Sequence, residues 1–257
     1  MPRPPVRLVL FDVFDTLVTP RLPVHDQYAA EAVRLGLRVT PAGVKAGFRP
    51  AFKEMNAQYP LYGKHSVPPL TPEKWWSTLI HKCMVHAGAG ASEVDQKGSE
   101  LAAALLKRFE SEVGYRAFED TMPTLRGLRE LGIKTSVVSN ADPRINLTLT
   151  ALGIEDLLSF PPTLSWDVEA SKPDREIFAR ACDACGEAMG EGVIMVGDEL
   201  EADFGGATGA GIEGRLIRRS GEWSEGAIRE AEEDLGSVNV VHSLEEVLAE
   251  ARARQGA

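Results

Sequence analysis

The chain has 257 residues, of which 38 are acidic and 28 are basic, so its formal charge at neutral pH is −10. This length allows one large domain or two smaller ones, each with a proper buried core. The acidic balance disfavours a nucleic-acid-binding protein, because the phosphate backbone of nucleic acid is itself negative. It still permits a small phosphorylated substrate, provided that a metal ion and a local lysine invert the field inside the site.

The sequence predicts a protein of the cytosol or nucleus that makes no contact with membranes. The N-terminal segment reaches Asp12 after a short apolar run, which is shorter than the hydrophobic region of a signal peptide. Nowhere does an apolar run approach the roughly 18 residues of a membrane span. The three cysteines are too few for a disulfide framework. The spacing around Cys182 and Cys185 places both on the core-facing side of a predicted helix.

The first predicted element is an apolar strand that ends in aspartate. The stretch "VLFDVFDTLVT", residues 9–19, predicts a buried strand followed by Asp12 and Asp15. Taken alone, it supports two interpretations. Aspartate is a favoured turn former, so Asp12 could simply begin the turn after the strand. Alternatively, the carboxylate is placed at the end of the strand for chemistry.

Residues 20–114 are predicted to form a helical cap domain inserted directly after the first strand. Four helices are expected there with no convincing strand between them, and two open with Thr-Pro, a favourable helix start. A lid inserted at this point could close over Asp12 and Asp15. The aromatic residues of the region are expected in its core, with a substrate pocket as the alternative. The helices are expected at 24–37, 40–58, 71–88 and 92–110, and the aromatics are Tyr59, Tyr62, Trp75 and Trp76.

From about residue 115 onward, helices alternate with short apolar strands. This alternation predicts a Rossmann-like, doubly wound parallel α/β sheet that is covered on both faces. Residues 1–19 and 115–257 together are therefore expected to form the α/β core domain. Strands are expected at 134–140, 192–198 and 214–219, and helices at 122–131, 143–153, 174–186 and 243–255.

Polar and charged residues follow several of the predicted strands. Because the carboxyl ends of parallel strands line the ligand crevice of an open sheet, we expect these residues to meet at one rim. Oxygen ligands suit Mg²⁺, a carboxylate can be a nucleophile, and a hydroxyl and an ammonium can hold phosphoryl oxygens. Each residue alone also fits a turn, a solvated lysine or an acidic helix start, but the set favours chemistry. The residues are Asp12, Ser139, Asn140, Lys172, Asp198, Glu199 and Asp203.

These motifs resemble those of the haloacid dehalogenase superfamily of hydrolases, whose helical cap the insertion also resembles. More narrowly, "YPLYG", the paired tryptophans and "SNAD" resemble the group named haloacid dehalogenase-like hydrolase domain-containing protein 3. The superfamily motifs are "DVFDTLVT" at 12–19, "SN" at 139–140, "KPD" at 172–174 and "GDELEAD" at 197–203.

The resemblance implies an Mg²⁺-dependent mechanism in which Asp12 is both the nucleophile and a metal ligand. It implies that Ser139, the Asn140 amide and Lys172 contact the transferring group, and that Thr16 braces the loop. The further metal ligands that it implies are the backbone carbonyl of Phe14, Asp198 and Asp203, with Glu199 in support.

One position departs from the phosphatase pattern of the superfamily. Phosphatases usually carry a second aspartate, the general acid and base, two residues after the nucleophile. This chain has Phe14 at that place and Asp15 one step later. In an extended chain, residues i and i+2 share a face and residue i+3 points away. Asp15 is therefore expected to be a turn or hinge residue, with a displaced acid as the alternative.

Three functions follow from these patterns. The preferred hypothesis is an Mg²⁺-dependent phosphatase for a small phosphorylated metabolite, because clustered carboxylates are costly without a cation. Haloacid dehalogenases carry an aromatic at the position of Phe14, which favours hydrolysis of a carbon–halogen bond. A weakened binding or regulatory protein is the third hypothesis, since losing general acid–base catalysis slows an enzyme by about 10²–10⁴-fold. Neither the substrate nor the oligomeric state is predicted.

Overall fold

A computed structural model describes residues 3–219, 229 and 232–256. The chain divides into two compact units. The first, called the α/β unit below, comprises Met1–Thr19 and Arg116–Ala257, and the second, the helical unit, comprises Pro20–Tyr115. The chain passes between the units in strands β2 (Val18–Pro20) and β3 (Tyr115–Ala117), which pair as a two-stranded sheet.

A six-stranded sheet forms the centre of the α/β unit. Its strands lie in the order β5-β4-β1-β6-β7-β8, and all five pairings are parallel. Every residue of β1 and β6 is buried, as expected of strands covered on both faces. The predicted parallel α/β sheet is therefore confirmed. The strands are β1 (Leu8–Phe11), β4 (Lys134–Ser139), β5 (Thr163–Leu164), β6 (Val193–Gly197), β7 (Glu213–Ile217) and β8 (Val240–Val241).

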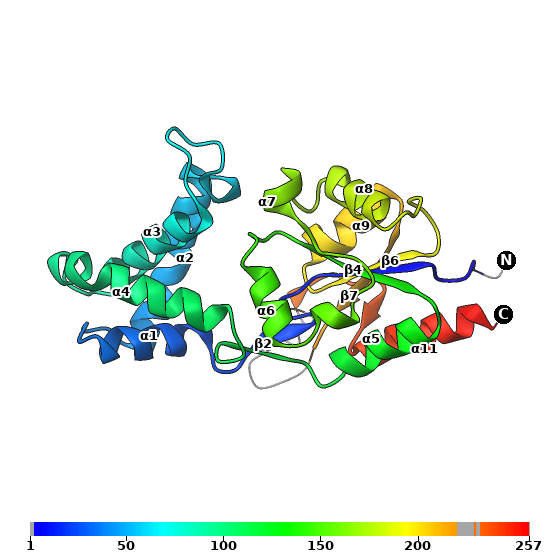
Figure 1. Cartoon of the computed structure of the whole chain (residues 1–257), viewed down its shortest axis with the longest axis horizontal. Helices are drawn as coiled ribbons and strands as arrows, with labels where there is room; N and C mark the ends of the chain where they lie inside the picture. Colours follow the sequence, from blue (N-terminus) through cyan, green and yellow to red (C-terminus); the bar gives the residue numbers. More distant parts are fainter. Residues whose placement is uncertain (1–2, 220–228, 230–231, 257) are drawn as a thin grey trace. The chain divides into compact units, whose positions relative to one another are not determined.

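Helices cover both faces of this sheet (Figure 1). Helices α5 and α11 pack together on one face, and α8 and α9 pack together on the other. Cys182 lies in α8 and Cys185 at its C-terminal end, and both are buried in the core cluster. This confirms that both face the core. The long helices are α5 (Thr121–Glu130), α8 (Arg175–Ala184) and α11 (Leu244–Gln255). The short ones are α6 (Ile145–Ala151), η2 (Glu155–Leu157), α7 (Ser165–Val168), η3 (Leu200–Gly205) and α9 (Gly206–Ala210).

Strands β5 and β8 and helix α7 are among the short elements of the α/β unit that were not expected from the sequence. Strands β5 and β8 have two residues each, and helix α7 has four. Segments this short span less than one period of a hydrophobic pattern, so periodicity carries no signal for them. The strands form because each adds to an edge of a sheet that already exists.

The helical unit contains α1 to α4 and the short turn η1. The hydroxyls of Thr40 and Thr71 accept hydrogen bonds from the backbone N–H groups of Gly43 and Lys74, at 3.1 and 3.3 Å. Both Thr-Pro pairs therefore start helices as predicted. The elements are α1 (Val24–Arg34), α2 (Pro41–Gln58), η1 (Leu61–Gly63), α3 (Pro72–His86) and α4 (Ala91–Phe109).

An aromatic cluster packs at the turn between α2 and α3. Trp75 is fully buried, and Tyr59, Tyr62 and Trp76 are partly buried against it. The Trp75 ring centroid lies 5.1 Å from that of Tyr62 and 5.2 Å from that of Trp76. The indole N–H of Trp75 also donates to the carbonyl of Tyr59 at 3.0 Å. These rings hold the end of α2 against α3.

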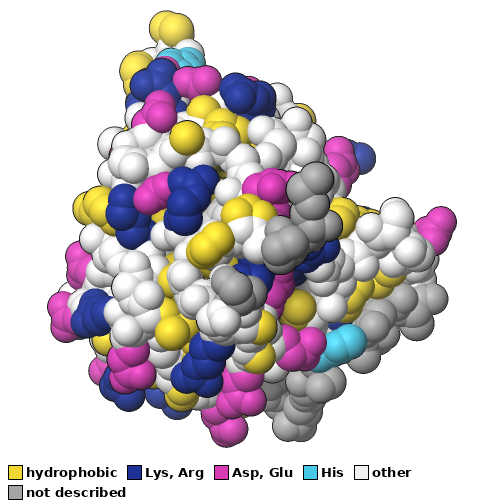
Figure 2. Space-filling view, turned by 90° about the vertical axis from the view of Figure 1, so that its right-hand side faces the viewer, with side chains coloured by type: hydrophobic (Ala, Val, Ile, Leu, Met, Phe, Trp, Pro, Cys, Tyr) yellow, Lys and Arg dark blue, Asp and Glu magenta, His cyan; other side chains and the backbone are white. Residues whose placement is uncertain are grey.

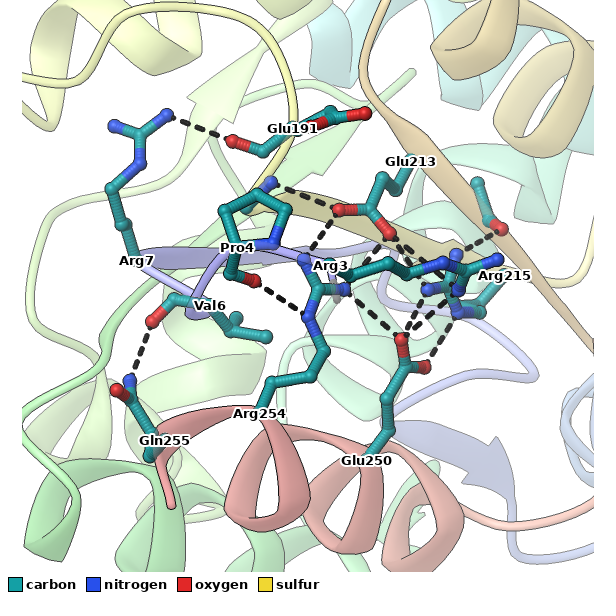
Figure 3. A network of polar contacts seen from close by, with 12 residues as sticks. Arg3, Pro4, Val6, Arg7, Glu191, Glu213, Arg215, Glu250, Arg254 and Gln255 are labelled. Atoms are coloured by element: carbon teal, nitrogen blue, oxygen red, sulfur yellow. Dashed lines mark hydrogen bonds and ion pairs between the residues drawn. The ribbon is translucent and has the colours of Figure 1, made fainter. Parts of the chain in front are cut away.

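A network of ion pairs lies at the amino end of β7, where α11 passes (Figure 3). The Arg215 guanidinium donates to Glu213 at 3.0 Å and to Glu250 at 2.5 Å, and Arg254 donates to Glu213 at 2.8 Å. Both arginines are buried, so each would be costly without its partners. Although burial opposes ionisation of Glu213, hydrogen bonds from Arg254, the Gly192 N–H and Arg215 lower its pKa to about 2. We call this group the β7–α11 network.

Charges of both signs are mixed on the visible surface. Figure 2 shows acidic and basic side chains interspersed with hydrophobic ones over that face. Across the described ranges, no helix combines the length and apolar character needed to cross a membrane.

Candidate active site

Three aspartates meet at the carboxyl ends of β1 and β6. Asp12 directly follows β1 and Asp198 directly follows β6, which is paired with β1. Asp203 belongs to η3, the turn that leaves β6. One oxygen of each carboxyl group lies within 4.8 Å of the others, and the three residues are 8%, 9% and 0% exposed. This cluster of carboxylate oxygens is the donor set that a hard divalent cation takes.

The turn η3, which follows β6 and Asp198, positions the side chain of Asp203. Element η3 is a π-helical turn, a form that is frequent at functional sites. The backbone N–H of Glu199 donates to Asp203 Oδ2 at 2.9 Å. Gly197 is required here, because a Cβ at that position would lie 2.2 Å from the Asp203 carboxyl group. The glycine in "GDELEAD" therefore makes room for the last aspartate of the motif.

Lys172 bridges two of the three carboxylates. Its Nζ donates to Asp12 Oδ1 at 2.5 Å and to Asp203 Oδ1 at 2.6 Å. Burial opposes the charge of this ammonium group, but the two carboxylates outweigh burial and raise the pKa of Lys172. The lysine is therefore positively charged at neutral pH. One ammonium group serves two carboxylates.

Negative charge exceeds positive charge in this cluster. Burial raises the pKa of Asp12 to about 6, with Lys172 opposing the rise and Asp203 adding to it. Burial also raises the pKa of Asp198 to about 8, reinforced by the charges of Asp12 and Asp203. Both shifts record carboxylates that lack enough compensating charge. A cation between them would lower both pKa values, because it stabilises the ionised forms.

Arg229 contacts the cluster from a part of the chain that the sequence analysis did not single out. Its Nη1 lies 2.8 Å from Asp198 Oδ2 and 3.3 Å from Glu199 Oε1. The Glu199 side chain is 59% exposed and lies outside the group of three carboxylates. The sequence carried no signal for Arg229, because it belongs to none of the motifs recognised above.

Ser139 and Asn140 end β4, but they differ in role. Ser139 is buried, on the strand that pairs with β1 so that Val137 is level with Phe11. It therefore lies at the same rim as Asp12. The side chain of Asn140 clamps the backbone of Lys172: its Nδ2 donates to the Lys172 carbonyl at 2.9 Å, and its Oδ1 accepts from the Lys172 N–H at 2.7 Å. This side chain thus positions the lysine.

The loop after Asp12 is a compact turn. The N–H groups of Leu17 and Val18 both donate to the carbonyl of Val13 at 2.9 Å, and Asp15 has a φ of 52°. Asp15 is therefore a turn residue, as expected, and its N–H donates to the carbonyl of Val18 at 2.8 Å, although the chain here is not extended as the argument about its direction assumed. The charge of Asp15 is among those that raise the pKa of Asp198.

Phe14 and Thr16 flank Asp15 in this loop. The Phe14 side chain is partly exposed at 37%, and its backbone forms an isolated bridge with Val18. Thr16 is fully buried, and within the described part of the chain its hydroxyl has no hydrogen-bond partner. Its carbonyl instead accepts two hydrogen bonds from Arg219. Thr16 is therefore joined to the rest of the unit through its backbone.

A model of the haloacid dehalogenase-like hydrolase family matches residues 6–211, which span every motif residue described above. The chain belongs to this family. It is 35% identical over 217 residues to haloacid dehalogenase-like hydrolase domain-containing protein 3 of Danio rerio. The matched region covers 84% of this chain and 87% of that protein.

Solved structures with the same fold include both chemistries that the sequence left open. One is a 2-haloacid dehalogenase from Pseudomonas syringae pv. Tomato DC3000, with a TM-score of 0.61, 20% identity and coverage of 97% of this chain and 99% of that one. Another is a HAD phosphatase from Thermococcus onnurineus, with a TM-score of 0.57, 22% identity and coverage of 94% and 96%. These likenesses show the fold alone, so the chemistry must be inferred from the site residues.

Proposed function

We propose that this hydrolase is an Mg²⁺-dependent phosphatase that acts on a small phosphorylated metabolite through an aspartyl-phosphate at Asp12. The observation that carries the proposal is the buried group of three carboxylates, which outnumber the two cationic side chains that contact them within the described residues, Lys172 and Arg229. A divalent cation would balance this charge, whereas the displacement of a halide needs no such cation. The helical unit would serve as the cap of this enzyme.

The residues present fit a bound Mg²⁺. Asp12, Asp198 and the backbone carbonyl of Phe14 would hold the ion. Asp203 would support them, since its two oxygens already accept hydrogen bonds from Lys172 and from the Glu199 N–H. When bound, Mg²⁺ would neutralise charge on the transferring phosphoryl group and orient it.

The protein's own residues would then carry the reaction in two steps. An oxygen of the Asp12 carboxylate attacks phosphorus, and the bond from phosphorus to the leaving oxygen breaks with its electron pair. Lys172 and Ser139 hold negative charge on the phosphoryl oxygens. Water then hydrolyses the aspartyl-phosphate, which releases inorganic phosphate and regenerates the carboxylate of Asp12.

The leaving group sets the preference of such a site. With Phe14 in the place of the usual acid, the departing oxygen leaves without a proton or takes one from water. Aryl and acyl phosphates, whose leaving groups are already stable, are therefore the preferred substrate class, and alkyl monoesters are slow.

A dehalogenase is the second candidate, and Phe14 is the observation that favours it. Turnover of an aryl phosphate and release of halide from a 2-haloacid, each with Mg²⁺ and with EDTA, separate the candidates. The proposal predicts aryl phosphate turnover that EDTA abolishes. Halide release that is unaffected by EDTA would establish the dehalogenase instead. Binding of Mg²⁺ without turnover on either substrate class, including a panel of phosphorylated metabolites, would indicate a binding or regulatory protein.

A further inference from the structure

We infer that Arg219 and Asp120 form a clamp that positions the nucleophile loop, residues 12–19. Arg219 follows β7 after one intervening residue, and Asp120 directly precedes α5. Both are far in sequence from the loop and outside every family motif described above. The inference rests on the proposed function, because the loop carries Asp12 and the carbonyl of Phe14.

Arg219 contacts the loop and Asp120 at the same time. Its Nε and Nη2 both donate to the carbonyl of Thr16, at 3.1 and 2.6 Å. Its Nη1 and Nη2 donate to the two carboxylate oxygens of Asp120, each at 3.0 Å. The guanidinium carbon lies 3.7 Å from the ring centroid of Phe118, and Arg219 is 7% exposed. Only a planar group with several donors can satisfy both acceptors in this geometry.

Asp120 connects this arginine to two helices. The carboxylate accepts a third hydrogen bond, from the backbone N–H of Leu244 at the start of α11, at 2.8 Å. Thr121, the next residue, donates from its hydroxyl to the carbonyl of Leu17 at 2.7 Å. Two successive carbonyls of the loop are thereby held near the start of α5. Arg219, which pairs with Asp120, binds the carbonyl of residue 16, and the Thr121 hydroxyl binds that of residue 17.

The loop contains one residue in the left-handed backbone region. Asp15 has a positive φ of 52°, a conformation that non-glycine residues rarely adopt and that persists where surrounding contacts fix it. The clamp fixes the Thr16 carbonyl directly after Asp15, and β1 fixes the chain directly before Asp12. The segment between them includes the Phe14 carbonyl, whose direction is therefore set from both ends.

A matched pair of arginines, Arg219 just beyond β7 and Arg215 within it, tests the inference. Arg219 is replaced by Lys and by Met, and Arg215 of the β7–α11 network is replaced in the same two ways. Arg215 is 3% exposed and also pairs with two carboxylates, but its partners are Glu213 and Glu250. Amide hydrogen exchange at Leu17 and Val18 reports on the loop, and calorimetric titration with MgCl₂ reports on the site.

Loss of the clamp should act locally. Arg219→Met should accelerate exchange at Leu17 and Val18 and weaken Mg²⁺ binding by about 10- to 100-fold, as removal of partners that orient metal ligands commonly does. Arg219→Lys should show the same changes to a smaller extent, and it carries the test should Arg219→Met fail to fold. The two Arg215 variants should leave both readouts unchanged even where they lower the free energy of unfolding.

The two results separate the clamp from the proposed function. Folded Arg219 variants whose loop exchange equals that of the Arg215 variants would overturn the clamp. Wild-type protein that binds no Mg²⁺ would instead contradict the proposed function, while the exchange comparison would still decide the clamp.

Discussion

The two ends of the central sheet differ in how their carboxylates are paired with cationic side chains. At the amino end of β7, Glu213 and Glu250 face Arg215 and Arg254, and each carboxylate accepts hydrogen bonds from both arginines (Figure 3). At the carboxyl ends of β1 and β6, three buried carboxylates lie together; Lys172 contacts those of Asp12 and Asp203, and Arg229 contacts that of Asp198. The first arrangement is complete with protein groups alone. In the second arrangement, the carboxylates outnumber the cationic side chains that contact them in the described part of the chain, so the cluster keeps a net negative charge.

The pKa values record the same contrast. Arginine hydrogen bonds overcome burial and lower the pKa of Glu213 to about 2, and they also lower that of Glu250. Burial and like charges raise the pKa of Asp198 to about 8 even though Arg229 contacts it. The carboxylates of the β7–α11 network are stabilised in their charged form, whereas those at the carboxyl ends of β1 and β6 are not.

The largest effect is expected from removing the nucleophile. Asp12→Asn keeps the shape of the side chain but cannot form the aspartyl-phosphate, so kcat for an aryl phosphate should fall by about 10³-fold or more. The free energy of unfolding at pH 8 should stay equal or rise, since a buried carboxylate with a raised pKa is lost. Near wild-type turnover in Asp12→Asn would rule out the covalent mechanism.

The identity of the acid is tested by moving a carboxyl group to position 14. Phe14→Asp should raise kcat/KM for an alkyl phosphate, by at most about 10²–10⁴-fold, because that leaving group needs a proton. An aryl phosphate should gain much less. If Asp15→Asn alone selectively destroys alkyl phosphate hydrolysis, then Asp15 is the displaced acid and Phe14 marks no loss.

Disrupting the β7–α11 network should lower the free energy of unfolding and leave kcat unchanged. Glu213→Gln leaves Arg215 and Arg254 with less compensating charge, and it should lower the free energy of unfolding by up to about 3 kcal/mol. Urea denaturation measures this change, and kcat per folded molecule should be unchanged. A loss of kcat without a loss of stability would show that the two ends are coupled.

The contributions of the two groups of carboxylates to the free energy of unfolding should also depend on pH in opposite directions. Glu213 has a lowered pKa, from 4.5 to about 2, so its stabilising contribution is present above pH 4.5 and lost as pH falls towards 2. Asp12 and Asp198 have raised pKa values, about 6 and about 8 against an ordinary 3.8. The unfolded chain therefore releases those protons first, and the metal-free protein should lose stability as pH rises from about 4 to 8.

Urea denaturation from pH 3 to pH 8.5 with EDTA, repeated with MgCl₂, checks both slopes. MgCl₂ should remove the decline in the free energy of unfolding between pH 6 and 8. It should leave the loss of stability at acidic pH, which is due to Glu213, unchanged. Asp198→Asn should flatten the decline without added metal. An EDTA profile that rises through pH 6 to 8 would show that the carboxylate cluster is already compensated.

The sequence was sufficient to predict the four central strands of the sheet, β4, β1, β6 and β7, and the polar residues that follow β1, β4 and β6. Asp12, Lys172, Asp198 and Asp203 each belong to a local motif at a strand end or a helix start, so spacing alone indicated that they meet. Arg219 and Asp120 carried no such signal, because the contacts of Arg219 with Thr16 and with Asp120 join three segments that are distant in sequence. Contacts of this kind exist only after folding.

Side-chain direction and loop conformation were the other quantities that the sequence could not supply. The positive φ of Asp15 invalidates an argument based on an extended chain. Nothing in the sequence indicated that the Asn140 side chain would bind the backbone of Lys172. A motif fixes which residues are available at a rim, whereas the tertiary hydrogen bonds decide where each one points.

The central claim is that the carboxyl-end cluster is completed by a divalent cation. Calorimetric titration of MgCl₂ at pH 7.5 into wild type, Asp198→Asn and Glu213→Gln tests it most directly. The account predicts one binding site in wild type, the same site in Glu213→Gln, and its loss in Asp198→Asn. Absence of Mg²⁺ binding in the wild type, or equal binding in Asp198→Asn, would contradict it.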